Sequence, residues 1–549
     1  MSGIDSRGLW ETSYIGRLVL LLFAAWDDSY TGRLLVGLGR FSALLFTGSL
    51  LGHLLFSDWP DATVVTESGI GRALAWLARR TVALGRKLQP VAAGLWNTSV
   101  LTGLVRWAGR AFQPVVSTSF IAQSYGGYAA DVELMPAENR RTGTSPLLYL
   151  LGTVVGLLSL LQQPAVTATG LTKLLSPTML IIVGIWGIAV LWVGRKIIVG
   201  DFEWRASSAG WPLAFFLVVA AGSTIQSVSR KDSLMNLVIW VTAVLLFWMI
   251  VNLVRNSRDA AALLGPILAA SVLMTAWAVY QQIKPPVIEE HWSDVTEFAN
   301  LVRSFAGFGN PNYLGEYLML FLPLALALWI QTPKRRAALT LLLGSMGLGL
   351  LLTSSRGAWV GALGALVLFV FMRNRRWSLL LVVAGLAGAV VAPASIIKRL
   401  ILGITFQDSS AAFRLNVWTG VFDMLKKFWL TGVGLGAVAF EKVYSDFMLG
   451  GAHVVHAHNI FLQMFSEMGI LGLIAVLWTL LAVIRLPFVA GLNAKGSFIT
   501  AAVPAALVGI LFQGMAEHIW YNPKLLFAFW AVAGLGVGLA LGEREGTKA

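Results

Sequence analysis

The stretch of sequence that decides the fold class is residues 458–484, HNIFLQMFSEMGILGLIAVLWTLLAVI. Beyond its first two residues it holds one charged side chain, Glu467, in an otherwise largely apolar run. A helix that crosses the hydrocarbon core of a membrane needs about 20 mainly apolar residues. The stretch therefore predicts a membrane-spanning helix. Its small residues Gly469 and Gly472 predict close approach by a neighbouring helix.

The composition of the whole chain indicates a protein that crosses the membrane many times. Hydrophobic residues make up 57% of the 549 residues and charged residues only 12%, whereas soluble domains carry about 25% charged residues. This composition excludes an ordinary cytosolic enzyme, a disordered chain and a nucleic-acid-binding protein. The absence of cysteine excludes a disulfide-stapled secreted scaffold. We expect the 22 tryptophans mostly as anchors at the membrane interfaces.

Apolar stretches from Pro146 onward predict an all-α polytopic core with about twelve transmembrane helices. They run near 146–163, 178–194, 210–228, 233–254, 262–282, 312–332, 336–354, 356–373, 378–397, 458–484, 496–515 and 523–541. Lysine and arginine concentrate in alternate loops when residue 146 is placed on the cytoplasmic side, as the positive-inside rule requires. Two long segments, 283–311 and 398–457, then lie outside the cytoplasm, and the second is expected to contain its own helices.

The first 145 residues differ from the core at 146–549. Charged residues recur so often that few windows stay apolar for the length of a membrane span. The stretch from Gly71 to Leu88 has a leucine-rich and an arginine-rich face at helical spacing. We interpret residues 1–145 as basic amphipathic helices on the cytoplasmic membrane surface. The alternative is that its first two apolar runs form a hairpin through the bilayer.

Histidines cluster where the long segment 398–457 meets the next membrane helix. His453, His456 and His458 are three of the six histidines of the chain, and Asn459 follows them. A metal site would need a further ligand, and no carboxylate is suitably spaced to complete one. We therefore expect no metal.

Four motifs follow one another along the predicted outer side. They are Asn310-Pro-Asn312; Ser355-Arg356-Gly357; Arg414-x-x-x-Trp418 before the glycine-rich stretch 432–436; and His458-Asn459-x9-Gly469-x-x-Gly472. In this order they resemble the motifs of bacterial O-antigen ligases and polymerases. The resemblance covers about residues 146–541 and leaves out the N-terminal region.

The resemblance implies a membrane glycosyltransferase of the multi-helix, GT-C-like type with a long helical extracytoplasmic loop. It implies transfer of a glycan from undecaprenyl diphosphate to an acceptor glycan or glycolipid, on the outer side of the cytoplasmic membrane and without a cofactor. His458 would act as general base or as a diphosphate contact, and Arg356 and Arg414 would bind the diphosphate. The expected substrate-binding residues are Asn310, Asn312, Asn459, Trp418, Glu517 and His518.

Other interpretations of these residues and of the chain stay open. Arg356 also fits a snorkelling residue at a helix end, Arg414 a charge on a solvated face, and Asn310 a turn beside Pro311. The chain also fits a polysaccharide polymerase, which joins lipid-linked repeat units. A bicarbonate or small-solute transporter is a further alternative, although the notable polar residues gather at one surface and not at the bilayer midplane.

Overall fold

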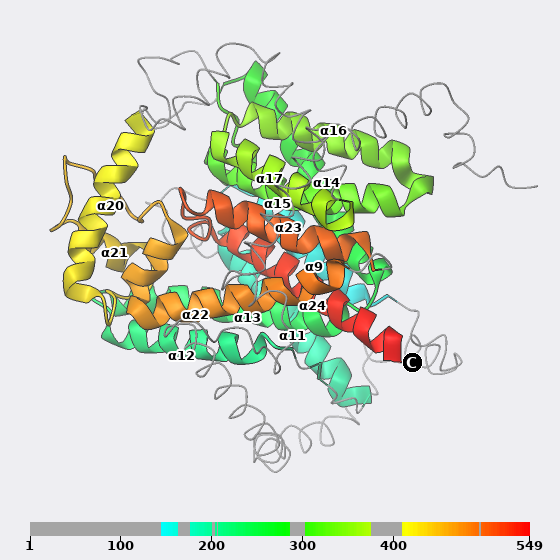
Figure 1. The fold of residues 1–549 in the computed structure, drawn as a ribbon, viewed down its shortest axis with the longest axis horizontal. Helices are drawn as coiled ribbons and strands as arrows, with labels where there is room; N and C mark the ends of the chain where they lie inside the picture. Colours follow the sequence, from blue (N-terminus) through cyan, green and yellow to red (C-terminus); the bar gives the residue numbers. More distant parts are fainter. Residues whose placement is uncertain are drawn as a thin grey trace, which may run out of the picture. The chain divides into compact units, whose positions relative to one another are not determined.

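The computed structural model describes residues 144–162, 176–199, 204–205, 207–285, 302–374, 409–492 and 496–548. Over these ranges the chain forms α-helices and short 3₁₀ helices and no β-strand (Figure 1). The elements are α9 (Pro146–Leu157), η1 (Leu158–Leu160), α11 (Pro177–Val199), α12 (Gly210–Gln226), α13 (Arg230–Leu253), α14 (Ser257–Ile283), η3 (Ala306–Phe308), α15 (Pro311–Gln331), η4 (Pro333–Arg335), α16 (Arg336–Leu352), α17 (Arg356–Arg373), α20 (Ser409–Phe428), α21 (Ala437–Tyr444), α22 (Ile460–Gly491), α23 (Phe498–Gln513) and α24 (Pro523–Lys548).

Among the described residues, eight helices are long and apolar enough to cross a membrane, and three shorter apolar helices accompany them. Each of these lies on one of the predicted spans, so the protein is an all-α polytopic membrane protein. The shorter helices α12 and α23 have 17 and 16 residues, which is about 25 Å at the rise of an α-helix. The predicted span 378–397 and nearly all of the predicted region 1–145 lie outside the described residues.

Helices α15 and α24 form the centre of the described bundle. Their apolar stretches are buried over most of their length, whereas little of that of α16 is buried. α24 packs against α13, α22 and α23, and α15 packs against α16, α17 and α23. The two central helices also contact each other. At the start of α15, the ring of Tyr313 lies 6.3 Å from that of Tyr521, in the turn, residues 514–522, that leads into α24.

Two glycines allow α17 to pack closely on α23. A Cβ atom added to Gly361 would lie 3.0 Å from the carbonyl oxygen of Gly509, and one added to Gly509 would lie 2.8 Å from that of Gly361. Small residues let helix backbones approach in this way inside membranes. Because α23 leads directly into the turn 514–522, this contact also positions that turn.

The helix α22 is broken at Gly469, which has φ 65° and ψ −167°. This backbone conformation is essentially restricted to glycine. A Cβ atom at this position would overlap the carbonyl group of Leu430, which belongs to the loop after α20. The expected approach of a neighbouring helix at Gly469 is therefore wrong, because a loop makes the close contact.

That loop, residues 429–434, bonds the peptide groups that the break in α22 leaves free. The N–H groups of Val433 and Gly434 donate to the carbonyls of Ser466 and Glu467 at 2.9 and 3.1 Å, and Ile470 N–H donates to the loop at 2.8 Å. In α12, the Ser223 hydroxyl adds a 2.6 Å hydrogen bond to the carbonyl of Glu467. Free peptide groups are costly in an apolar surrounding, so the loop completes the membrane domain.

Helices α20 and α21 form a small second core. Val417 and Val421 of α20 pack with Phe440 and Tyr444 of α21, and all four side chains are buried. The expectation that the long segment 398–457 contains its own helices is confirmed over the described residues from 409 onward.

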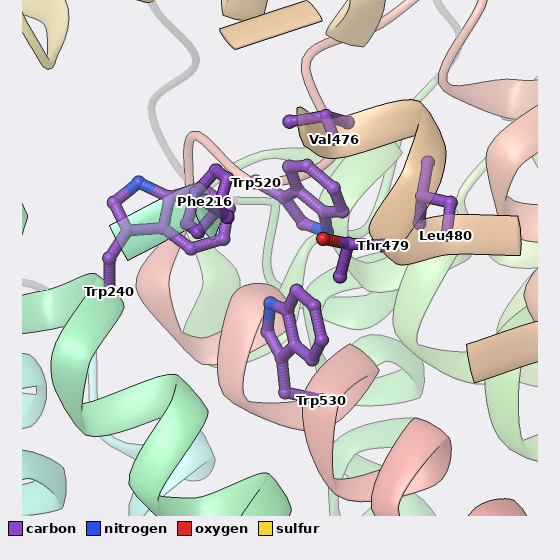
Figure 2. A pocket seen from close by; sticks show the side chains of 7 residues that line it. All are labelled: Phe216, Trp240, Val476, Thr479, Leu480, Trp520 and Trp530. Atoms are coloured by element: carbon purple, nitrogen blue, oxygen red, sulfur yellow. The ribbon is translucent and has the colours of Figure 1, made fainter. Parts of the chain in front are cut away.

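A buried aromatic cluster includes one residue of the turn 514–522, Trp520, which Figure 2 shows together with Trp240 and Trp530. The ring of Trp520, from this turn, lies 5.1 Å from that of Trp240 and 6.3 Å from that of Trp530, measured between centroids. These three tryptophans anchor the turn from inside the bundle, so they are exceptions to the expectation that most tryptophans lie at the membrane interfaces. The gap that they line has no room for a water molecule; its other walls are Phe216, Val476, Thr479 and Leu480.

Candidate active site

A buried carboxylate in the turn 514–522 lies at the centre of the predicted site. Glu517 is 3% exposed, and its Oε1 lies 3.0 Å from Nδ1 of His458. Its Oε2 accepts a 3.2 Å hydrogen bond from the Asn312 amide and lies 4.0 Å from Nη2 of Arg414. Residues from three of the four motifs therefore meet at one side chain.

His458 has an unusual backbone conformation immediately before α22. Its φ of 46° falls in the left-handed region, which residues other than glycine rarely adopt. Asn459 then caps α22, because its Oδ1 accepts hydrogen bonds from two N–H groups of the first turn. Its Nδ2 donates to the carbonyl of Met515 at 2.8 Å. These bonds fasten the start of α22 to the turn 514–522 and bring His458 to Glu517.

Asn312 connects three parts of the site through its side-chain amide. Its Oδ1 accepts hydrogen bonds from Ser355 Oγ and Arg303 Nη2, each at 3.0 Å, and its Nδ2 donates to Glu517. Asn310 caps α15 by accepting a 2.8 Å hydrogen bond from the Asn312 N–H. Asn310, one of the three asparagines predicted to bind substrate, therefore uses its side-chain oxygen to cap the start of α15.

Arg356 is the first residue of α17 and is partly buried. Both of its neighbours in the sequence contact the site network. Ser355 donates to Asn312, and Gly357 packs so closely on Gln513 that a Cβ atom would overlap that side chain. Gln513 ends α23, just before the turn 514–522. These contacts place the backbone of Arg356 at the edge of the site.

Helix α20 contributes Arg414 and, one turn later, Trp418. The Nε atom of Arg414 is buried and has no hydrogen-bond partner among the described residues. The indole N–H of Trp418 donates to the carbonyl of Ala457 at 3.0 Å. This bond ties α20 to the residue before His458. Arg414, beside Glu517, therefore has an Nε–H group without a partner among the described residues, which is hydrogen-bonding capacity for an anion.

The three clustered histidines differ in their surroundings. His453 is exposed, His458 is partly buried and His456 is buried. Burial, followed by the neighbouring His458, lowers the pKa of His456 to about 3. The His456 ring accepts a 3.3 Å hydrogen bond at Nδ1 from the N–H of His458, as a neutral imidazole does. His456 is therefore a neutral buried neighbour of His458.

Glu517 is ionised although it is buried. Burial alone would raise its pKa, but the interactions with His458 and with Arg414 outweigh the burial and hold the pKa well below its usual range. A carboxylate only accepts hydrogen bonds, so the Nδ1 atom of His458 that faces it carries the proton. In the neutral ring, Nε2 of His458 is then the basic nitrogen.

His518 lies behind this group. It is buried, its Nδ1 has no hydrogen-bond partner among the described residues, and its ring centroid is 5.7 Å from that of His456. Burial, followed by the nearby His456, holds its pKa well below the ordinary value. His518 therefore stays neutral, and its ring packs next to the ring of His456.

Arg303 and Ser355 belong to the network but are absent from the predicted site. Arg303 donates from Nη2 to Asn312 and from Nε to the carbonyl of Thr353, at 3.0 and 3.2 Å. Ser355 stands in the Ser-Arg-Gly motif, so the sequence did carry a signal for it. Arg303 lies in the long segment 283–311 and has no motif around it, so only the fold brings it to the site.

The same groups have the composition of a metal site. Ligand atoms of His456, His458 and Glu517 all lie within 4.8 Å of one another, and two imidazoles with one carboxylate suit divalent metals. Glu517 is the carboxylate partner that the sequence spacing did not reveal. Arg414 lies 4.0 Å from that carboxylate, and its positive charge opposes a cation at the same place.

Comparisons with known proteins point to one superfamily. A family profile described as O-antigen ligase matches residues 339–477, which include Arg356, Arg414 and His458. An O-antigen ligase of Pseudomonas aeruginosa is 27% identical over 248 residues. The alignment covers 42% of this chain, and the chain spans only 58% of the length of that relative. The matches confirm the resemblance to the O-antigen ligase and polymerase superfamily of polysaccharide biosynthesis.

Proposed function

We propose that the chain transfers a glycan from an undecaprenyl-diphosphate-linked donor to an acceptor sugar or a cell-surface polymer, outside the cytoplasmic membrane. The similarity to O-antigen ligases supports this reaction class. The observation that carries the proposal is that His458, Arg414 and Asn312 meet at the ionised Glu517. The distribution of lysine and arginine in the loops supports an outer location for this group.

The proposed role of His458 is to accept the proton of the acceptor hydroxyl at Nε2. Glu517 orients the ring through Nδ1 and stabilises the imidazolium as it forms, as carboxylates do beside catalytic histidines. The hydroxyl oxygen bonds to the anomeric carbon while the bond from that carbon to the diphosphate oxygen breaks. Undecaprenyl diphosphate leaves with the electron pair. General base catalysis of this kind contributes about 10²- to 10⁴-fold in rate.

Arg414 and Arg356 are the proposed diphosphate contacts. A guanidinium group offers a planar set of donors that binds phosphate oxygens in pairs. Arg414 suits this role because its Nη2 lies 4.0 Å from Oε2 of Glu517, while its Nε has no hydrogen-bond partner among the described residues. Positive charge in a partly buried site stabilises the charge that develops on the leaving diphosphate.

Two other functions make different demands on the same structure. A polysaccharide polymerase would use the same chemistry with a second lipid-linked repeat unit as acceptor. A transporter would use the carbonyls of a broken membrane helix to coordinate ions. In α22 the carbonyls of Ser466 and Glu467 at the break already accept hydrogen bonds, which favours glycosyl transfer over transport.

The test compares His458→Ala with the matched variant His453→Ala, which changes an exposed histidine of the same segment. Purified proteins are assayed with a lipid-diphosphate-linked glycan and an acceptor in the presence of a chelator. The proposal expects a loss of about 10²- to 10⁴-fold for His458→Ala and near-normal transfer for His453→Ala. Normal transfer by His458→Ala would remove this residue from the mechanism. Chelator-sensitive activity that zinc restores would make His456, His458 and Glu517 a metal site.

A further inference from the structure

Helix α20 has an exposed apolar stripe in addition to its buried face. The buried face, with Val417, Val421 and Met424, packs in the small core that α20 forms with α21. Leu415 and Phe422 of α20, and Trp429 immediately after it, follow one another at intervals of seven residues. They are 46%, 54% and 53% exposed. Residues at this spacing lie along one side of a helix, so they form a continuous surface, here called the apolar stripe.

Apart from Phe413, which is 39% exposed and whose ring lies 6.0 Å from that of His458, the exposed large side chains of α20 outside the apolar stripe are polar. Asn416 and Thr419 are exposed, and further along the helix Lys426 forms a 2.6 Å salt bridge with Asp423. At about 100° per residue, these positions lie beside the apolar stripe and away from the buried face. A helix in water would be polar over its whole exposed surface. Separate buried, apolar and polar sectors suit a helix that lies at a membrane surface.

The apolar stripe adjoins the exposed surface of a membrane helix. Gln226, the last residue of α12, donates a 2.6 Å hydrogen bond to the carbonyl of Thr431, two residues after Trp429. α12 has its own exposed apolar side chains, Val218 at 69% and Ile225 at 72%. In a polytopic membrane protein such a surface faces lipid. The lipid-facing surface of α12 therefore continues through Trp429 onto α20.

We propose that α20 lies in the membrane surface on the side of the active site, with the apolar stripe inserted among the lipids of that leaflet. Figure 1 shows α20 running across the direction of α22, as an interfacial helix runs relative to the spanning helices. The hydrogen bonds between the loop 429–434 and the break in α22 hold the end of α20 at the level of the membrane domain. The partner of the apolar stripe is the lipid bilayer itself.

Spin labels on single cysteines test this placement, and the natural chain contains no cysteine that would interfere. Phe422→Cys places a label on the apolar stripe, and the matched variant Thr419→Cys places one on the polar sector three residues away. The full chain is reconstituted in phospholipid vesicles. Collisions of each label are measured with oxygen, which concentrates in lipid, and with a water-soluble nickel complex. Unchanged melting temperatures of the labelled variants verify their folding.

The proposal expects the label at residue 422 to collide mainly with oxygen and the label at 419 mainly with nickel, a several-fold difference in their ratio. A scan along 412–429 should show oxygen maxima at 415, 422 and 429. Equal access of nickel to residues 419 and 422 would overturn the proposal, because the apolar stripe would then face water. Shielding of residue 422 from both reagents, with spin–spin broadening, would also overturn it by assigning the stripe to a second copy of the chain. None of these outcomes depends on glycan transfer.

Discussion

Replacing Glu517 by glutamine should slow glycan transfer by about 10- to 150-fold without unfolding the protein. The amide keeps the shape of the side chain but removes the charge that faces His458 at 3.0 Å and Asn312 at 3.2 Å. A hydrogen bond to a charged group is worth about 1.5–3 kcal/mol, and about 1.4 kcal/mol corresponds to a tenfold change in rate. In the proposed mechanism His458 takes the proton of the acceptor hydroxyl, and the loss falls on the transition state because the carboxylate stabilises the charge that this transfer places on the ring.

The assay measures kcat and KM for donor and acceptor with purified protein in lipid. We expect Glu517→Gln to lower kcat and to change KM little, because the carboxylate stabilises a charge that develops during the reaction. Asp446→Asn is the matched control, since it removes an exposed carboxylate from the segment after α21. A normal kcat in Glu517→Gln would refute the reasoning. An increase in KM alone would make Glu517 a contact to the bound substrate instead.

Three further changes test other parts of the structure. Arg356→Lys should lower transfer by about tenfold or more, because an ammonium group cannot replace paired guanidinium hydrogen bonds; a fully active variant would make Arg356 a simple helix-end residue. The pKa of His456 is about 3 in the folded protein and about 6.5 in the unfolded chain. Between about pH 3 and about pH 6.5, therefore, only the unfolded chain binds a proton at this residue. Stability should therefore fall by up to about 1.4 kcal/mol for each pH unit below about 6.5, and thermal melts of His456→Gln should show a smaller slope. Gly469→Ala should destabilise the protein by about 1–3 kcal/mol or more, whereas Gly344→Ala, which has open space around it, should not; equal melting temperatures would contradict the structural role of the break.

Much of the fold follows from the sequence because the membrane imposes its requirement on each segment separately. An apolar run of sufficient length has to become a helix whatever its neighbours are, so each described membrane helix falls on a predicted span. The break at Gly469 is different, because its conformation depends on the loop 429–434 that bonds to it. Gly469 stands within the motif, yet nothing in its local sequence separates a helix contact from a backbone break.

The candidate site was predictable where a motif carried it and less so where the fold assembled it. His458 and Arg414 stand in motifs, and both lie beside Glu517 in the structure. Glu517 itself was expected only as one of several substrate contacts, because its position becomes central through a hydrogen bond with Asn312, 205 residues away in the chain. Arg303 joins the site through a similar long-range contact, with the carbonyl of Thr353, and no local sequence pattern predicts it.

The broken helix α22 also constrains how the protein is made. Its break is completed by Ser223 and by the loop 429–434, and the ribosome delivers both before Gly469. The partners of the break are therefore already in place when this part of α22 emerges, as folding during synthesis from the N-terminal side requires. A substitution in the loop would therefore affect membrane insertion and folding before any substrate binds. The newly inserted α22 would lack hydrogen bonds at its break and would be exposed to membrane proteolysis.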